Sequence, residues 1–325
     1  MSEVRLKWVV PEPLLKVYHN LLYGAHVIRG FMSRSSAFAM VILCLPAVIA
    51  PARVMSQAND WTAVTSAIGR PGAIQADGAM KYSLPRSDLA VTLDGVRLKP
   101  ALALGSWVAF KRTSDGNAVA MGDLVLTEAE ESPVITSLQQ GDVKQTAVHN
   151  HLLRESPRIV YVHIEAQGEA VRIATAIRAA LNLTATPPAS AAPSVVAPID
   201  MDTAMIHRTL GYAGKVNGGV YQVSVPRSEA IRMDGEVIPP SMGVATAINF
   251  QPTASGRAAI TGDFVMQGNE VSRVIPILRA GQIAITALHS HMIGEEPRLY
   301  FMHFWANNDV TGLATTLRRA LDQLK

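Results

Sequence analysis

Two segments of the chain carry three histidines and a glutamate at the same spacing. The first, TAVHNHLLRESPRIVYVH, runs from Thr146 to His163, and the second, TALHSHMIGEEPRLYFMH, runs from Thr286 to His303. They lie 140 positions apart and hold six of the nine histidines. Neutral imidazole nitrogens with a carboxylate oxygen are a common ligand set for borderline divalent ions. Each segment therefore predicts a metal site, and the ligands would be His149, His151, Glu155 and His163 in the first and His289, His291, Glu295 and His303 in the second.

The predicted ligand set suits Zn, Mn, Fe, Ni or Cu. An ion with an open coordination position would activate water or dioxygen, with Glu155 or Glu295 as ligand or catalytic general base. Histidine binds metal only as the neutral imidazole, so we expect metal affinity to fall below about pH 6. The sequence leaves open whether the protein is an enzyme.

Other functions fit the same residues. The duplication could preserve a structural network of hydrogen bonds, or an acid–base or ligand site without metal. A non-catalytic cell-envelope module would instead bind a small molecule, carbohydrate, peptide or protein. Its ligand-binding residues would be Arg158 and Arg298, which suit a carboxylate or phosphate, together with Phe301 and Trp305 on the histidine face.

A β-hairpin would bring the histidines of each segment together. Residues two apart on a strand share a face, so His149 and His151 point the same way, as do Tyr161 and His163. A turn near residues 155–156 then places the odd-numbered residues of both strands on a common face. The same reasoning applies to the second segment, with one site expected per hairpin.

Further polar residues recur in both copies. Arg86 and Arg227 stand in PRS, and Asp123 and Asp263 stand in GD. Each suits a structural role by itself, and together they could form ion pairs around the histidine face.

The surrounding elements repeat in the same order. Asp60 and Gly69 bound a first helix in one copy, as Asp202 and Gly211 do in the other. Strand-like runs follow, with an Asp-Gly turn signal in VTLDGVRL and IRMDGEVI. More strands than helices predict an α+β fold of two pseudo-symmetric tandem repeats with mostly antiparallel sheets, each with a histidine-bearing β-hairpin flanked by helices.

The chain divides at a segment rich in Pro and Ala, residues 183–201, which is typical of an extended linker. We assign 59–182 to repeat A and 202–325 to repeat B. The excess positive charge lies in residues 1–58, and the rest is close to neutral, so we expect no nucleic-acid partner. No Gly-rich phosphate loop, G-x-S-x-G or H-E-x-x-H motif is present, which argues against nucleotide-dependent and α/β-hydrolase chemistry.

Residues 1–58 are typical of a leader. Its residues 32–58 resemble a signal peptide, with Arg34, an apolar run from Ala37 to Ala52, and the small residues Ser56 and Ala58. Either Met1 or Met32 would serve as the start. Cleavage after Ala58 predicts a periplasmic or secreted protein, whereas an uncleaved leader would be its membrane contact. Cys44, the one cysteine, lies in this run, so the mature chain would lack thiolate ligands and disulfides.

The start of each histidine segment, H-x-H-x3-E, resembles the first metal motif of cupins, but the third histidine follows too soon for that fold. Both segments, with FWANND after the second and TGDFVM upstream of it, resemble the LppY/LpqO family of exported bacterial proteins. The resemblance covers both repeats and implies an exported tandem domain of unknown function. The chain departs from the lipoproteins of that family, because Leu43 before Cys44 is not small.

Overall fold

The computed structural model describes residues 60–189 and 198–324. The leader, the signal peptide and residues 190–197 of the linker lie outside this range. Both repeats belong to one compact unit. Within the described residues, no helix combines the length and apolar character needed to cross a membrane.

Repeat A contains four helices and eight strands. In chain order they are α1 (Thr62–Ile68), β1 (Ala73–Ile74), β2 (Met80–Pro85), β3 (Thr92–Leu93), β4 (Val96–Arg97), α2 (Pro100–Ala103), β5 (Gly105–Arg112), β6 (Ala118–Thr127), α3 (Glu128–Gln140), β7 (Lys144–His149), β8 (Ile159–Gly168) and α4 (Ala170–Leu181).

Repeat B follows the same order, with a 3₁₀ turn in place of α2. Its elements are α5 (Thr203–Leu210), β9 (Gly214–Asn217), β10 (Val220–Pro226), β11 (Ile231–Met233), β12 (Glu236–Ile238), η1 (Pro240–Met242), β13 (Ala245–Ala254), β14 (Arg257–Met266), α6 (Gly268–Ala280), β15 (Ala284–His289), β16 (Tyr300–Asp309) and α7 (Val310–Leu321).

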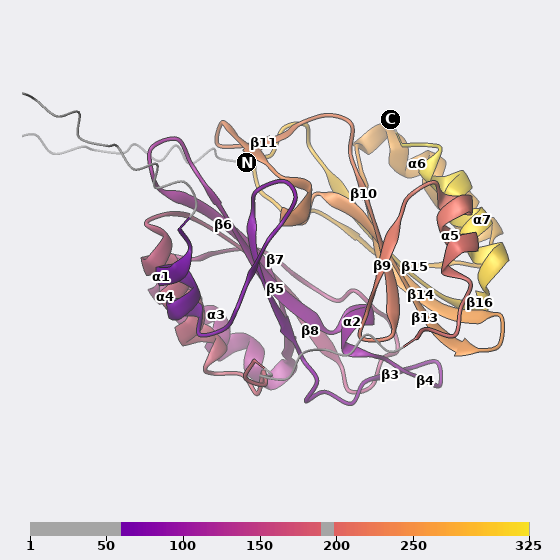
Figure 1. The fold of residues 1–325 in the computed structure, drawn as a ribbon, viewed down its shortest axis with the longest axis horizontal. Coiled ribbons are helices and arrows are strands. Elements are labelled where there is room, and N and C mark those ends of the chain that lie inside the picture. Colours follow the sequence, from indigo (N-terminus) through magenta and orange to yellow (C-terminus); the bar gives the residue numbers. More distant parts are fainter. Residues whose placement is uncertain (1–59, 190–197, 325) are drawn as a thin grey trace, which may run out of the picture. The chain divides into compact units, whose positions relative to one another are not determined.

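Each repeat builds one six-stranded antiparallel sheet. The orders are β1-β2-β5-β6-β8-β7 and β9-β10-β13-β14-β16-β15, which are equivalent between the repeats. Helices flank the strands, as Figure 1 shows for repeat A in indigo to magenta and for repeat B in orange to yellow. The predicted α+β fold with two similar halves is therefore confirmed.

The helix boundaries depend on local capping groups. Helix α5 begins after Asp202, whose carboxylate accepts a 2.8 Å hydrogen bond from the Met205 amide, and ends at Gly211, where φ is 78°. Helix α1 ends at Gly69 with φ of 75°. It begins one residue later than predicted, because Asp60 accepts from the Thr62 amide and Trp61 is the capping residue.

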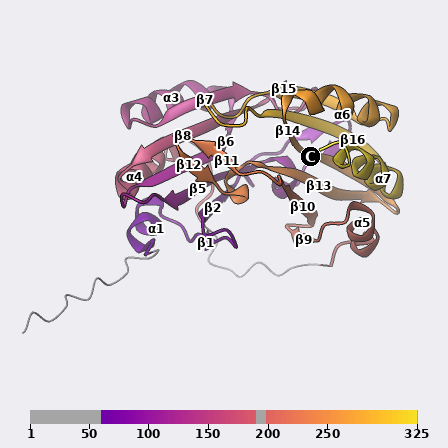
Figure 2. The same ribbon diagram turned by 90° about the horizontal axis from the view of Figure 1, so that it is seen from above.

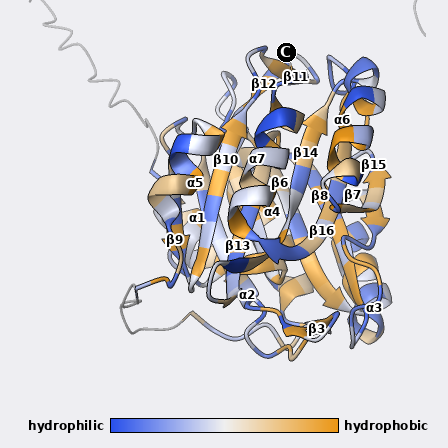
Figure 3. Cartoon of the chain, turned by 90° about the vertical axis from the view of Figure 1, so that its right-hand side faces the viewer, coloured by the Kyte–Doolittle hydropathy of each residue, from blue (hydrophilic) through white to orange (hydrophobic). Residues whose placement is uncertain are grey.

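Each sheet packs its two faces against different partners. One face packs on the helices of its own repeat, with Phe110, Val162 and Ile177 in repeat A and Phe250, Phe304 and Leu317 in repeat B. Figure 2 shows the two sheets between the helices α1 and α4 of one repeat and α5 and α7 of the other. In Figure 3 the helices in front of the repeat B sheet carry hydrophilic turns, while much of the sheet behind them is hydrophobic. The remaining face of each sheet is directed toward the other repeat.

Two short hairpins cross between the repeats. We call residues 91–98, with β3 and β4, arm A, and residues 231–238, with β11 and β12, arm B. Arm A packs with Val220, Ala259 and Trp305 of repeat B, and arm B packs with Ala109, Val119 and Met121 of repeat A, among others. The exchange creates two further apolar cores that contain residues of both repeats.

The predicted Asp-Gly signals form the arm turns. Asp94 and Gly95 have φ of 46° and 80°, and Asp234 and Gly235 have φ of 50° and 82°. Two successive positive φ values are the geometry of the tight hairpin turn that Asp-Gly favours. Hydrogen bonds then hold the arms to the opposite repeat at equivalent places: Lys111 donates to the Val237 carbonyl at 2.7 Å, and Gln251 donates to the Arg97 carbonyl at 2.8 Å.

Candidate metal centre

The histidine-bearing hairpins have the predicted register. His149 pairs with Tyr161 and Ala147 with His163, so the side chains of His149 and His163 lie on one face. Repeat B has the same pairing, His289 with Phe301 and Ala287 with His303. His151 and His291 lie just beyond the first strand of each hairpin, in the loop. Their rings still lie 4.8 and 4.9 Å from those of His149 and His289.

The two histidine trios meet in a single cluster. Across the repeat interface, the ring centres of His149 and His289 are 3.7 Å apart, as are those of His151 and His303, and of His163 and His291. The sequence predicts one site per hairpin, and its spacing does not indicate that the two lie side by side. The pairing follows from the packing of the two sheets, which directs the histidine faces toward each other.

Potential ligand nitrogens lie close enough to share metal ions. Those of His149, His151 and His163 are within 4.8 Å of one another, and so are those of His149, His289, His291 and His303. These groups match the two repeats, and His149 belongs to both. A metal site built by imidazoles is therefore geometrically available.

Burial keeps the cluster histidines neutral. His163, His291 and His303 are 6%, 7% and 3% exposed. Loss of hydration is the largest cause that lowers the pKa of all six imidazoles, and charge repulsion within the cluster adds to it for most of them. The pKa of His149 is lowered to about 3. Neutral imidazole is the form that binds metal.

The ring nitrogens are left with few protein partners. Nδ1 of His303 lies 3.0 Å from the Gly262 carbonyl, and Nδ1 of His289 lies 3.2 Å from the Ser290 carbonyl. A carbonyl only accepts, so these Nδ1 atoms carry the proton and Nε2 presents its lone pair. Among the described residues, Nε2 of all six cluster histidines is buried without a hydrogen-bond partner. A second nitrogen tied to a carbonyl is typical of a metal-binding histidine.

Two aspartates, one per repeat, adjoin the cluster. Asp123 and Asp263 pair in register with His163 and His303 on the neighbouring strands. The Asp123 carboxylate lies 3.8 Å from Nε2 of His151 and 3.9 Å from Nε2 of His163, and Asp263 lies 3.4 Å from Nε2 of His291. The 140-residue repeat of GD was the sequence signal for these residues, which we had not included among the ligands.

Burial also changes the protonation of these aspartates. Desolvation raises the pKa of Asp123 to about 8, partly opposed by the charge of Lys81. Desolvation and the nearby Asp123 raise the pKa of Asp263 well above its usual range. One carboxylate oxygen of each, Oδ1, has no hydrogen-bond partner among the described residues.

The two predicted glutamates lie within the loops that join β7 to β8 and β15 to β16. Oε1 of Glu155 accepts from the Ile159 amide at 3.5 Å, and Oε1 of Glu295 accepts from the Leu299 amide at 2.9 Å. In the described part of the chain, neither forms an ion pair with a histidine, and the ligand groups that meet consist of histidines. The structure thus brings the six predicted histidines together, while Oε1 of each glutamate accepts from the loop backbone. Oε2 of Glu295 is buried without a hydrogen-bond partner among the described residues.

Aromatic rings form the walls of the cluster. His151 stacks on Tyr161 with centres 3.5 Å apart, and His291 stacks on Phe301 at 3.6 Å. Phe301 is fully buried. Trp305 is 3% exposed and donates from its indole to Asp94 of arm A at 3.0 Å, so it joins the two repeats.

The predicted arginines lie outside the cluster. Arg158 is exposed and lies 3.8 Å from Glu128, and Arg298 is half-exposed and lies 3.5 Å from Glu295. Arg86 is fully buried between Asp88 and Glu130, where it also donates to a strand carbonyl. Arg227 is paired in the same way with Glu229 and Glu270. Arg86 thereby holds Glu130 in the first turn of α3, and Arg227 holds Glu270 in the first turn of α6.

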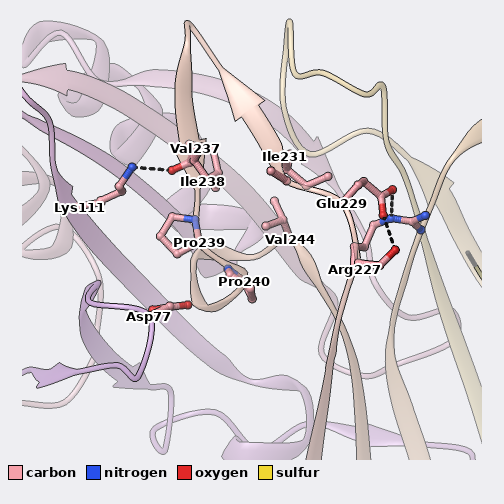
Figure 4. A pocket seen from close by; sticks show the side chains of 12 residues that line it. Asp77, Lys111, Arg227, Glu229, Ile231, Val237, Ile238, Pro239, Pro240 and Val244 are labelled. Carbon is pink, nitrogen blue, oxygen red and sulfur yellow. Dashed lines mark hydrogen bonds and ion pairs between the residues drawn. The ribbon is translucent and has the colours of Figure 1, made fainter.

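Among the cavities in the described part of the chain, two lie between the repeats. The larger, of about 390 Å³, lies beside arm B (Figure 4). Its polar side chains already have partners, such as Lys111 with the Val237 carbonyl, and no histidine lines it. The smaller, of about 10 Å³, contacts His163, His291 and Thr146. That volume is about what one water molecule requires.

Comparisons with solved structures give weak likenesses. A trimeric bacterial microcompartment shell protein, PduB, shares 12% identity over 78% of this chain and 89% of its own, with a TM-score of 0.22. EtuB from Clostridium kluyveri shares 9% identity over 77% of this chain and 88% of its own, with a TM-score of 0.19. Scores this low carry no argument about fold or function. Curated proteins gave no match.

The repeats themselves match a family of domains. The model of the family described as Domain of Unknown Function (DUF1259) matches residues 62–183 and again residues 204–323. The two matches cover one histidine trio each. The chain therefore belongs to the DUF1259 family and carries its domain twice in tandem.

Proposed function

We propose that this protein binds a divalent transition metal in the six-histidine cluster between its repeats, and that it does so outside the cytoplasm. The observation that carries the metal proposal is that, in the part of the chain the structure describes, the six cluster Nε2 atoms are buried without a hydrogen-bond partner. Leaving a buried polar atom unpaired costs about 1–3 kcal/mol, and metal ligation would offset that cost.

The donor set narrows the class of ion. Uncharged imidazole nitrogens suit Zn, Cu, Fe and Ni, and neighbouring carboxylates extend the range toward Mn. The ions Ca and Mg prefer oxygen ligands, so they fit poorly. When bound, the ion would supply Lewis acidity or lower the pKa of a bound water. The cavity beside His163 and His291 would admit a molecule of that size.

The structural-network alternative has less support. Such a network would pair most of the imidazole nitrogens with one another or with backbone groups. Among the described residues, hydrogen bonds of this kind are seen at two of the twelve nitrogens, Nδ1 of His289 and Nδ1 of His303. Burial also argues against a binding face formed by Phe301 and Trp305, which are 0% and 3% exposed. Arg158 and Arg298 remain accessible to an anionic cell-envelope ligand.

Metal analysis of purified protein tests the proposal. Inductively coupled plasma mass spectrometry should find stoichiometric metal in the wild type and in His207→Gln, because His207 is exposed and distant in sequence from the cluster. The variant His151→Gln/His291→Gln should lose it. Protein that stays metal-free after incubation with Zn, Mn, Fe, Ni and Cu salts, while folded by circular dichroism, would refute metal binding.

The location rests on the sequence of residues 32–58 and on the resemblance to the LppY/LpqO family. Expression of the full chain in a Gram-negative host, followed by fractionation, should place the protein in the periplasm. N-terminal sequencing should then begin at Asn59, the residue after the predicted cleavage point. Retention of the leader in a membrane fraction would show an anchor in place of a cleaved signal.

A further inference from the structure

The cluster contains more donors than one ion can use. Six imidazoles and the carboxylates of Asp123 and Asp263 make eight donors in contact. First-row ions accept about four to six ligands. Resting on the metal binding proposed above, we propose that the cluster is a two-metal centre, in which Asp123 and Asp263 each provide one ligand.

The donors already separate into two sets. The nitrogens of His149, His151 and His163 lie within 4.8 Å of one another, and those of His289, His291 and His303 form a second group that also reaches His149. Apart from His149, which belongs to both groups, each group comes from the hairpin of one repeat. With one aspartate added, each repeat supplies three nitrogens and one oxygen, a complete set for a four-coordinate ion.

The aspartate positions fit the edges of such a site. Two donors about 2.1 Å from one tetrahedral ion lie about 3.4 Å apart. Asp263 lies 3.4 Å from Nε2 of His291. Asp123 lies 3.8 and 3.9 Å from Nε2 of His151 and His163, so small shifts would close the remaining gap. The atom of Asp263 near His291 is Oδ2, and the atom of Asp123 near His163 is Oδ1. Oδ1 of both aspartates is buried without a hydrogen-bond partner among the described residues.

The two sets also lie in direct contact across the repeat interface. The three ring pairs that face each other across the interface have centres 3.7 Å apart. Donor sets in direct contact are what a two-metal site requires, since its ions lie about 3.5–4 Å apart. Two divalent ions would also stabilise the charged form of both buried carboxylates, whose pKa values burial raises.

Copper loading with electron paramagnetic resonance tests the proposal. Purified protein freed of metal and loaded with Cu(II) should bind two ions per chain, and its spectrum should show coupling between them. Asp123→Asn and Asp263→Asn should each bind one ion and show the spectrum of isolated Cu(II). The matched control Glu155→Gln/Glu295→Gln, which also removes one buried carboxylate per repeat, should keep two coupled ions.

The outcomes separate this proposal from metal binding itself. One ion in the wild type, or two ions without coupling, would overturn the two-metal centre and leave metal binding intact. Two coupled ions in Asp123→Asn and Asp263→Asn would overturn the role of the aspartates as ligands. No bound copper, with no other metal retained, would refute both proposals. The wild-type measurement decides the ion count even if a variant fails to fold.

Discussion

At the scale of single residues, burial decides the protonation of the cluster. In an unfolded chain a histidine titrates near pH 6.5, but in the folded protein desolvation lowers the pKa, to about 3 for His149. These histidines stabilise the folded state above pH 6.5, and that contribution is lost as the pH falls toward the folded pKa. Because the lowered pKa keeps the imidazoles neutral at lower pH, metal should stay bound somewhat below pH 6, the limit expected for histidines of ordinary pKa.

Asp123 acts in the opposite sense. Its pKa is raised to about 8 from an unfolded value of 3.8, so its contribution is present below pH 3.8 and lost as the pH rises through 8. Between pH 7 and pH 4.5 the six histidines outnumber the two aspartates. The loss of the histidine contribution to the free energy of unfolding therefore outweighs the aspartate contribution in the metal-free protein over this range.

We predict that the metal-free protein becomes less stable as the pH falls from 7 to 4.5. Each histidine that charges only on unfolding contributes on the order of 1 kcal/mol per pH unit. Urea unfolding at several pH values measures the slope, which should be smaller in His149→Gln/His163→Gln and unchanged in His207→Gln. Equal stability at pH 7 and pH 4.5 would contradict the prediction.

At the scale of elements, the arms decide how the repeats join. Each arm is a short two-stranded hairpin, which is marginal by itself. It is stabilised by packing on the opposite repeat, as arm A does around Trp305. The indole adds a hydrogen bond to Asp94 at the arm turn.

We predict that Trp305→Ala lowers the free energy of unfolding by about 3–5 kcal/mol, because a large buried side chain is removed. Trp305→Phe keeps most of the packing and loses the hydrogen bond to Asp94, which costs about 1 kcal/mol, with a further small loss of packing. Chemical denaturation of both variants gives the comparison. Similar losses in the two variants would mean that the hydrogen bond matters more than the packing.

At the scale of the whole molecule, the repeats depend on each other. Two of the apolar cores contain residues of both repeats, and one face of each sheet has its cover from the other repeat. The histidine cluster has the same origin, since its closest ring pairs join the repeats.

We predict that residues 60–189 and residues 198–324, produced separately, do not unfold cooperatively as monomers. Mixing them should restore a cooperative transition and a complex of the size of the intact chain, measured by circular dichroism and gel filtration. A half that alone unfolds at the midpoint of the intact protein would show that the repeats are independent domains.

Much of this architecture can be predicted from the sequence because its signals are local. Strand alternation places His149 and His163 on one face, Asp202 and Gly211 bound α5, and Asp94-Gly95 forms the arm turn. Each depends on a few neighbouring residues, whose backbone preferences are the same in any fold. The duplication doubles every such signal.

The joint centre depends on contacts between residues far apart in the chain. A 140-residue offset shows that two trios exist, but it is the same whether they lie far apart or side by side. His149 meets His289 because the two sheet faces pack against each other. Asp123 lies opposite His163 because β6 is the neighbour of β8 in the sheet. Local patterns carry no information on such packing, because face and strand partners are chosen by the burial of apolar surface across the whole molecule.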